Sequence, residues 1–255
     1  MRSFWLFRLL NPAVLHIYPV GTARLHCTTG TRQWIVEGGQ SLTLTRTSDP
    51  VRICGPAGES VSCVLEIPNV IRRPYSGVFT VQGHGESVLP IVSMGCETAT
   101  GSIVAAELPV SIAPIEALRA QAVVSRSVLC ATRTPRHDCA DFCDTTHCQF
   151  LRSPAMPDST GALATRTTGG IALYQRGRRM PALYSAACGG QTESGFDGAF
   201  EYASVPCEVC RSARNVRRGH GWGLCQEGAM GLARLGWRWR EILAKYYPNA
   251  TPLFV

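Results

Sequence analysis

The segment IVAAELP (103–109) contains the first residue that could do chemistry, the carboxylate Glu107. Small and apolar residues precede it and Pro109 follows, so we expect this side chain at the end of an element and partly removed from water. Loss of hydration raises the pKa of a carboxyl group and allows it to act as a general acid near neutral pH. A glutamate that merely ends a helix has the same local sequence, and taken alone the segment favours that structural interpretation.

Histidine and cysteine side chains are dense in the segment RHDCADFCDTTHCQF (136–150). Its members that could ligate a metal are His137, Cys139, Cys143, His147 and Cys148. Thiolate and imidazole groups this close together can surround Zn²⁺ tetrahedrally. The spacing differs from the paired CxxC motifs of a zinc ribbon, so disulfides, or buried thiols that behave as small hydrophobic groups, are the alternatives.

Two glycine-flanked segments, YSAACGGQTES (184–194) and GHGWGLCQEGAMG (219–231), combine permissive backbone with polar side chains. His220 and Gln226 have the donors and acceptors that recognise hydroxyl and amide groups of a sugar. Tight turns beside helix starts have the same composition and are the structural alternative. A nucleophilic pair of Cys188 and His220 is disfavoured, because the CG[SA]C[WY] signature of papain-like enzymes is absent.

A further pair, Cys207-Glu-Val-Cys210, is a true CxxC motif. A redox pair, half of a metal site and a local disulfide all fit it, and no βαβ pattern surrounds it to favour the first. The 255-residue chain contains 12 cysteines, a number that indicates disulfides, a metal or both.

The elements that position these residues fall into two parts. Residues 21–95 are expected to be β-rich, because short runs of Val, Thr, Ile and aromatic residues alternate with Gly and Pro. The expected strands are Thr22–Cys27, Gln33–Glu37, Ser41–Arg46, Val61–Ile67 and Gly77–Gly83. Runs this close together indicate hairpins rather than βαβ units.

Residues 96–255 are expected to form the second part, in which helices carry or flank the candidate residues. Helices are expected at Glu97–Glu107, from Pro114 to about Arg133, over about Cys225–Leu235, and through Trp239–Tyr246. Residues 135–165 are expected to form a loop stapled by its cysteines, followed by strands at Gly170–Gln175 and Pro181–Ser185. The fold class is therefore α+β.

The expected helix after Pro114 has apolar residues on one face and Arg119 and Arg126 on another. Gln121 and Ser125 share a side otherwise made of Ala and Val. We expect these two polar side chains at the surface, and a position facing a cleft is the alternative.

Residues 1–20 are expected to be an irregular arm or a degenerate export signal. Their apolar run is broken by Arg8, Asn11, Pro12 and His16, and no clear small-residue cleavage site follows. The run falls short of the roughly 18 clean apolar residues of a transmembrane helix.

The composition and charge of the chain restrict the kinds of partner that we expect. The net charge is +7 at pH 7, and Lys245 is the only lysine among the 25 basic residues. A positive electrostatic field that comes almost wholly from arginine side chains favours binding to anionic or polar polymers. No long run of basic residues is present, so we expect no nucleic-acid partner.

Eight segments, in order over about residues 74–250, resemble the stage II sporulation protein D family (SpoIID/LytB), bacterial proteins that act on peptidoglycan. They are RPYSGVF, VAAELP, PIEALRAQAVVSRS, DFCDTTHCQ, TTGGIALY, ALYSAACGGQTES, GHGWGLCQEGAMG and WREILAKYYPNA. The resemblance implies a mixed α/β architecture with a groove for a glycan strand. It also implies lytic transglycosylase activity, outside the cytoplasm, on glycan stripped of its stem peptides.

The resemblance also implies roles for single residues. The family's catalytic glutamate falls on Glu107, which would cleave the MurNAc–GlcNAc bond and leave a 1,6-anhydroMurNAc end. Some members bind zinc through a histidine and two cysteines, here His137, Cys143 and Cys148, whereas others lack the metal. The residues that we expect at the glycan are Gln121, His147, Gln149, Ser185, Gly189, Gly190, His220, Gly221 and Gln226.

The sequence departs from the family pattern at Cys225, where serine is common, and in the additional Cys207 and Cys210. Two other functions stay open beside the enzyme. One is a non-catalytic glycan-binding module that activates a cell-wall amidase, and the other is a zinc-stabilised interaction protein. The expected partners are peptidoglycan glycan strands and, for the first alternative, the amidase; no oligomeric state is indicated.

Overall fold

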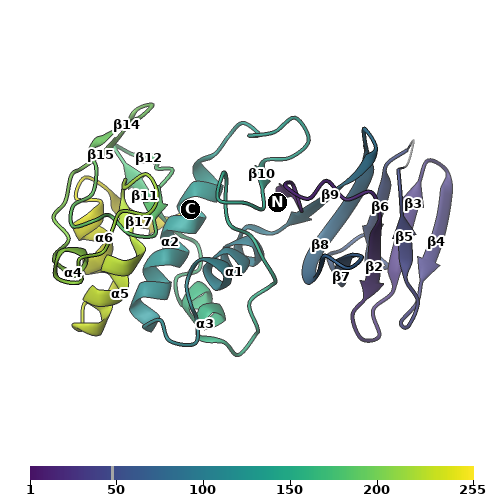
Figure 1. The fold of residues 1–255 in the computed structure, drawn as a ribbon, viewed down its shortest axis with the longest axis horizontal. Helices are drawn as coiled ribbons and strands as arrows, with labels where there is room; N and C mark the ends of the chain where they lie inside the picture. Colours follow the sequence, from purple (N-terminus) through teal and green to yellow (C-terminus); the bar gives the residue numbers. More distant parts are fainter. Residues whose placement is uncertain (47–48) are drawn as a thin grey trace. The chain divides into compact units, whose positions relative to one another are not determined.

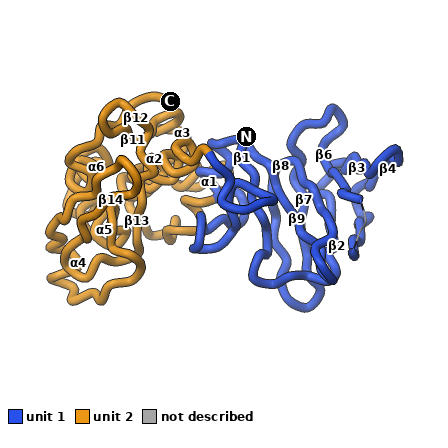
Figure 2. Tube along the Cα trace, turned by 90° about the horizontal axis from the view of Figure 1, so that it is seen from above, with its two compact units in different colours: residues 1–102, 134–154 blue, residues 103–133, 155–255 orange. Residues whose placement is uncertain are grey.

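The computed structural model describes residues 1–46 and 49–255, and the chain divides into two compact units (Figure 2). The first unit comprises residues 1–102 and 134–154, and the second comprises residues 103–133 and 155–255. The segment 134–154, expected in the second part, therefore belongs to the first unit. The predicted α+β class is confirmed.

The first unit is built on a 10-stranded sheet. Its strands are β1 (Arg2–Trp5), β2 (Leu15–Pro19), β3 (Leu25–Thr29), β4 (Arg32–Val36), β5 (Leu42–Leu44), β6 (Val51–Cys54), β7 (Val61–Ile67), β8 (Ile71–His84), β9 (Ser87–Met94) and β10 (Phe142–Cys143). The main path runs β10-β1-β9-β8-β6-β3-β4, and β2 joins β5 to β7, which pairs with β8. Except for β1–β10, every pairing is antiparallel, as expected of hairpins.

Strand β8 changes partner at Gly77. The residues before it pair with β7, ending at Gly77 opposite Val61, and those after it pair with β9, beginning at Val78 opposite Ser93. A Cβ atom at Gly77 would lie 2.6 Å from the carbonyl oxygen of Ser93, so a side chain has no room at this junction.

Residues 1–20 do not form an irregular arm, and that expectation is wrong. They contain β1 and β2, whose inward side chains Phe4, Leu15 and Ile17 are fully buried. β1 pairs with both β9 and β10, and β2 pairs with both β5 and β7. The polar interruptions that weaken the apolar run fall between the strands or on their outward faces, where strand alternation tolerates them.

The second unit packs helices around α2 (Ile115–Ala131), which contacts α3, α5, α6 and β11 (Figure 1). The other helices are α1 (Cys96–Glu107), which ends in this unit, α3 (Thr160–Thr167), α4 (Glu208–Ser212), α5 (Gln226–Arg234) and α6 (Trp239–Tyr246). The strands are β11 (Ile171–Gln175), β12 (Arg178–Arg179), β13 (Tyr184–Ser185), β14 (Gly195–Asp197), β15 (Phe200–Tyr202), β16 (Leu224–Cys225) and β17 (Thr251–Phe254). β11 is the centre of a small sheet between β12 and β17.

The four predicted helices are confirmed, with boundaries within a few residues of the expected ones. The expected loop at 135–165 in fact contains β10 and the start of α3, which Ser159 caps by accepting a hydrogen bond from the amide of Ala162. The expected strand at Pro181–Ser185 shrinks to the two residues of β13. In the part of the chain that the structure describes, no helix is both long and apolar enough for a transmembrane span.

The expectation that α2 has a solvated polar side is wrong. Arg126, Gln121 and Ser125 are all fully buried. The guanidinium of Arg126 donates to the carbonyl oxygens of Ile171 at 3.0 Å and Thr165 at 3.3 Å. Because helices and β11 surround α2, its polar residues are satisfied inside the unit rather than by water.

Candidate functional site

Glu107 is the last residue of α1, and its side chain is half-buried. The hydroxyl of Tyr184 donates to Oε1 at 3.1 Å, and Nε2 of Gln226 donates to Oε2 at 3.1 Å. Each carboxylate oxygen therefore has a neutral donor. The two donors hold the plane and direction of the carboxylate while they leave it part of its exposure.

A short parallel pairing brings Tyr184 and Gln226 to the same place. In β13 and β16, Tyr184 pairs with Leu224 and Ser185 pairs with Cys225. Helix α5 begins directly after β16, so Gln226 is its first residue. The two glycine-flanked segments that the sequence singled out thus meet beside Glu107.

A chain of buried amides supports the site from behind. Nε2 of Gln226 also contacts Oε1 of Gln121 at 3.3 Å, and Nε2 of Gln121 donates to the hydroxyl of Ser125 at 3.0 Å. Gln121 is thus buried behind the site rather than at the surface. Gln226 links Gln121 to Glu107, so the contacts of Gln121 support another side chain.

The hydroxyl of Tyr184 stays protonated in this site and can donate to Glu107. Burial raises the pKa of Tyr184 well above 10, and the charge of Glu107 and the hydrogen bond to it raise that pKa further. Tyr184 therefore keeps its proton at physiological pH and continues to donate to the carboxylate.

Other carboxylates near these segments are paired with arginine. Glu193 forms an ion pair with Arg217, and Glu227 lies 2.9 Å from Arg218. The two hydrogen bonds to Glu107 described above come from neutral groups.

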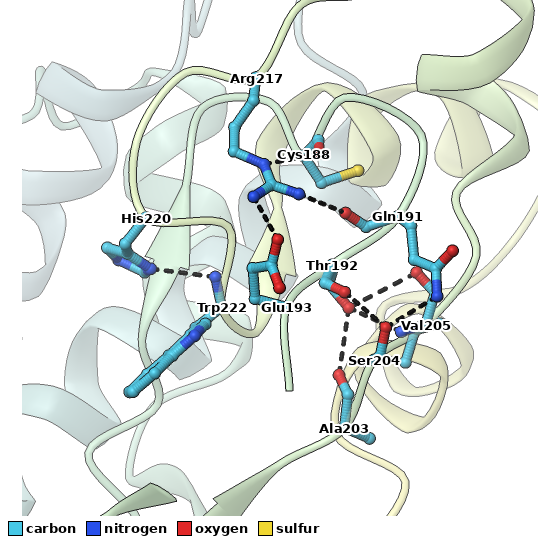
Figure 3. Close-up of polar contacts among 10 residues, drawn as sticks. All are labelled: Cys188, Gln191, Thr192, Glu193, Ala203, Ser204, Val205, Arg217, His220 and Trp222. Atoms are coloured by element: carbon cyan, nitrogen blue, oxygen red, sulfur yellow. Dashed lines mark hydrogen bonds and ion pairs between the residues drawn. The ribbon is translucent and has the colours of Figure 1, made fainter. Parts of the chain in front are cut away.

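The loop 188–193 is fastened to the segment 217–222 (Figure 3). The guanidinium of Arg217 contacts the carboxylate of Glu193 and the carbonyl oxygens of Cys188, at 3.3 Å, and Gln191, at 3.5 Å. On the other side of the loop, the Thr192 hydroxyl accepts a hydrogen bond from the amide of Val205 at 2.8 Å. These contacts fix the positions of both glycine-flanked segments, and none of them involves Glu107.

The backbone of Gly189 and Gly190 adopts φ angles of 76° and 108°, which side-chain-bearing residues rarely adopt. Gly221 has a φ of 82°, and a Cβ there would lie 3.2 Å from Cγ of Glu193. Ser185, also expected at the glycan, is buried. Among the described residues, its hydroxyl has no hydrogen-bond partner.

The imidazole of His220 lies at the exposed edge of this region. Its Nδ1 accepts a hydrogen bond from the amide of Trp222 at 3.0 Å (Figure 3). Desolvation lowers the pKa of His220 below 6.5, against a smaller opposing effect of a hydrogen bond to the backbone of Tyr184. His220 is therefore neutral at pH 7 and keeps one ring nitrogen as an acceptor.

The histidine and cysteine cluster lies in the first unit. One ligand atom from each of His137, Cys143, His147 and Cys148 lies within 4.8 Å of the others. Nε2 of His137 is 3.2 Å, and Nδ1 of His147 is 3.3 Å, from Sγ of Cys148. The structure thus brings together the three residues that the resemblance implied as ligands and adds His147, which was expected at the glycan.

This donor set fits zinc. Two sulfur and two nitrogen atoms can complete a tetrahedral site, and only small movements separate the observed spacing from coordination. Burial raises the pKa of Cys143, but hydrogen bonds from Thr145 and Arg8 outweigh it and lower the pKa overall. Desolvation lowers the pKa of His137, so its neutral, ligating form prevails.

Two other expected residues lie in the same segment. Cys139 is half-buried and is not among the clustered ligand atoms. Gln149 is buried, and its Nε2 donates to the carbonyl of Cys148 at 2.8 Å, so it supports the backbone of the cysteine loop.

Sequence reasoning missed Tyr184 as a partner of Glu107. The only available signal was its place at the start of the segment YSAACGGQTES, since a lone tyrosine before a serine carries no recognisable motif. It also missed that Cys188 and Cys225 lie with the CxxC pair, because these residues are far apart in the chain.

Comparison with known proteins identifies one family. Residues 84–174 match the SpoIID family model, described as stage II sporulation protein. That range contains Glu107, Gln121 and the histidine and cysteine cluster, and it ends before Tyr184. No curated protein matches the chain. The matched segment therefore supports a SpoIID family assignment, and this family suggests a role connected with the cell wall.

Proposed function

We propose that the protein is a lytic transglycosylase that cleaves peptidoglycan glycan strands, with Glu107 as the single general acid and base. The observation that carries this proposal is the carboxylate of Glu107, half-buried and held on both oxygens by the neutral donors Tyr184 and Gln226. A substrate of this kind places the site of action in the cell envelope, outside the cytoplasm.

In the first step, protonated Glu107 gives its proton to the oxygen that links MurNAc to GlcNAc. The bond from MurNAc C1 to that oxygen breaks, and an oxocarbenium-like centre forms at C1. The new carboxylate accepts hydrogen bonds from Tyr184 and Gln226, which stabilise it more than the neutral acid. The donors therefore assist the step in which Glu107 gains negative charge.

In the second step, the Glu107 carboxylate takes the proton from the C6 hydroxyl of the same MurNAc. The C6 oxygen closes onto C1 and leaves a 1,6-anhydro end, and Glu107 returns to its acid form. An intramolecular hydroxyl reacts at a high effective concentration, so no second carboxylate is needed to activate water. This chemistry agrees with the arginine pairing of Glu193 and Glu227.

Polar groups near Glu107 supply contacts that a sugar could use. The buried hydroxyl of Ser185 lacks a partner among the described residues, and the imidazole of neutral His220 lies at an exposed edge. The exposed imidazole can contact the hydroxyl and N-acetyl groups of a glycan.

Zinc fits the cluster of His137, Cys143, His147 and Cys148. With all four ligands from the protein, the ion would cross-link the loop and leave no open position for a reacting water. Its role in the proposed reaction is therefore structural.

The test uses glycan strands from which an amidase has removed the stem peptides. Wild-type protein should release soluble fragments with 1,6-anhydroMurNAc ends, detected by mass spectrometry. Glu107→Gln should remain folded by circular dichroism and release less than about one-hundredth as much. Glu201→Gln, which removes a carboxylate paired with Arg176, should match the wild type.

The amidase-activator alternative gives a different result. Wild-type protein would then be retained by the glycan without releasing any soluble sugar, and amidase activity would rise in its presence. That outcome, or wild-type release by Glu107→Gln, contradicts the proposed function.

A further inference from the structure

The thiols of Cys188, Cys207, Cys210 and Cys225 converge in the interior of the second unit. Their four Sγ atoms lie within 4.8 Å of one another, and each residue is at most 1% exposed. All four follow the segment that matches the family model, and the proposed reaction uses none of them. All are free thiols.

The spacing of the sulfur atoms suits a tetrahedral metal ion. Zinc–sulfur bonds of about 2.3 Å place the corners of a ZnS₄ tetrahedron about 3.8 Å apart. The sulfurs of Cys210 and Cys225 are 3.4 Å apart, close to that value and far from the roughly 2.0 Å of a disulfide.

Local backbone structure directs the four side chains inward. Cys207 is the N-cap of α4 and Cys210 lies in its first turn, which gives the CxxC spacing. Cys188 precedes Gly189 and Gly190, whose positive φ angles turn the chain sharply. The amide of Cys207 donates to the carbonyl of Gly190 at 2.9 Å, which joins the two turns.

Backbone amides surround the fourth cysteine. Sγ of Cys225 accepts hydrogen bonds from the amides of Cys188 and Gly228, both at 3.3 Å. A Cβ atom at Gly228 would lie 2.7 Å from Sγ of Cys207, so a glycine is needed for helix α5 to pack this close. Amide donors of this kind stabilise the negative charge of metal-bound thiolates.

Side-chain donors reach the CxxC pair. The Tyr246 hydroxyl lies 3.3 Å from Sγ of Cys207, and Nδ2 of Asn215 donates to Sγ of Cys210 at 3.8 Å. Arg217, which is ion-paired with Glu193, donates to the carbonyl of Cys188 at 3.3 Å (Figure 3). The surroundings therefore complement a buried negative group better than four neutral thiols.

We propose that Cys188, Cys207, Cys210 and Cys225 bind one structural Zn²⁺. The four thiols lose their protons to solvent on binding, and the resulting tetrathiolate zinc carries a net charge of −2. Four protein ligands close the coordination shell, so the ion takes no part in catalysis. It would fasten together the segments that carry Tyr184 and Gln226, and it is independent of the proposed reaction.

The experiment uses the full chain with His137→Ala and His147→Ala, which removes two donors of the other cluster. The protein is produced in zinc-supplemented medium and purified without chelator or reductant. We expect about one zinc per chain by inductively coupled plasma mass spectrometry. Adding Cys207→Ala should lower zinc at least about tenfold, whereas Cys63→Ala, which alters a fully buried thiol outside both clusters, should not.

Two further measurements keep the test decisive if the Cys207→Ala protein does not fold. Alkylation followed by peptide mapping should find the four cysteines protected until a chelator removes the metal. Cobalt substitution of the double-histidine variant should give the intense visible bands of a tetrahedral thiolate site. Disulfides among these four cysteines, iron in place of zinc, or zinc unaffected by Cys207→Ala would each overturn the proposal.

Discussion

The hydroxyl of Tyr184 donates a 3.1 Å hydrogen bond to Oε1 of Glu107, although 77 positions separate the two residues in the chain. The contact depends on β13, where Tyr184 pairs in parallel with Leu224, and on the end of α1. It gives the carboxylate a neutral partner that keeps its proton, because the pKa of Tyr184 is raised.

Tyr184→Phe should slow release of anhydro sugars about 10–100-fold, because the charge that develops on Glu107 loses one of its donors. The variant keeps the ring and should retain the wild-type circular dichroism spectrum. Tyr174→Phe, which removes an exposed hydroxyl bonded to Arg179, is the matched control and should leave the rate unchanged. Equal rates for wild type and Tyr184→Phe would exclude a role for the hydroxyl.

Gln226→Leu should lower the free energy of unfolding by about 1–3 kcal/mol, because the buried carbonyl oxygen of Gln121 loses its donor. Adding Gln121→Leu removes the carbonyl oxygen that has lost its donor. The double variant should therefore lose less free energy of unfolding than the sum of the losses in the two single variants. Chemical denaturation of the four proteins measures this coupling. Strictly additive losses would show that the two amides do not act together.

Local pattern was enough to predict the helices that hold the site, but not the contacts within it. Pro114 and the apolar spacing of Trp239–Tyr246 are signals inside one element, and both helices are present. The Tyr184–Glu107 contact depends on pairing between distant segments, which no local pattern encodes. The resemblance supplied Glu107 and the three expected ligands, whereas the four-cysteine cluster required the three-dimensional structure.

For the first 20 residues and for the polar face of α2, local sequence pattern also failed to predict the structure. Arg8, Asn11 and Pro12 interrupt the apolar run, so the sequence did not reveal strands β1 and β2 on either side of them. In α2, Arg126 looked like a solvated charge, yet the carbonyls of Ile171 and Thr165 satisfy it inside the unit. Burial depends on what packs against an element, so periodicity within the element could not reveal it.

Arg126→Met should reduce the free energy of unfolding by about 2–4 kcal/mol, since the carbonyls of Ile171 and Thr165 would remain buried without their charged donor. Arg119→Met, at a partly exposed position paired with Glu116, should cost less than about 1 kcal/mol. Denaturant unfolding of both variants tests the difference. Similar losses would contradict a structural role specific to Arg126.

Stability should fall as the pH drops below about 6.5, in part because of His220. Its pKa in the folded protein is lowered, so the unfolded chain binds the proton more readily over this range. The contribution is complete above 6.5 and is lost as the pH falls through the folded pKa. His220→Gln should weaken this pH dependence between pH 5 and 8, and an unchanged slope would show that His220 does not contribute.

The central claim is that one carboxylate and the substrate's own C6 hydroxyl cleave the glycan without water. The most direct measurement digests peptide-stripped glycan in water enriched in ¹⁸O and analyses the new ends by mass spectrometry. The account predicts 1,6-anhydroMurNAc ends without label for the wild type, and none for Glu107→Gln. Labelled reducing ends, or unlabelled anhydro ends from Glu107→Gln at the wild-type rate, would contradict it.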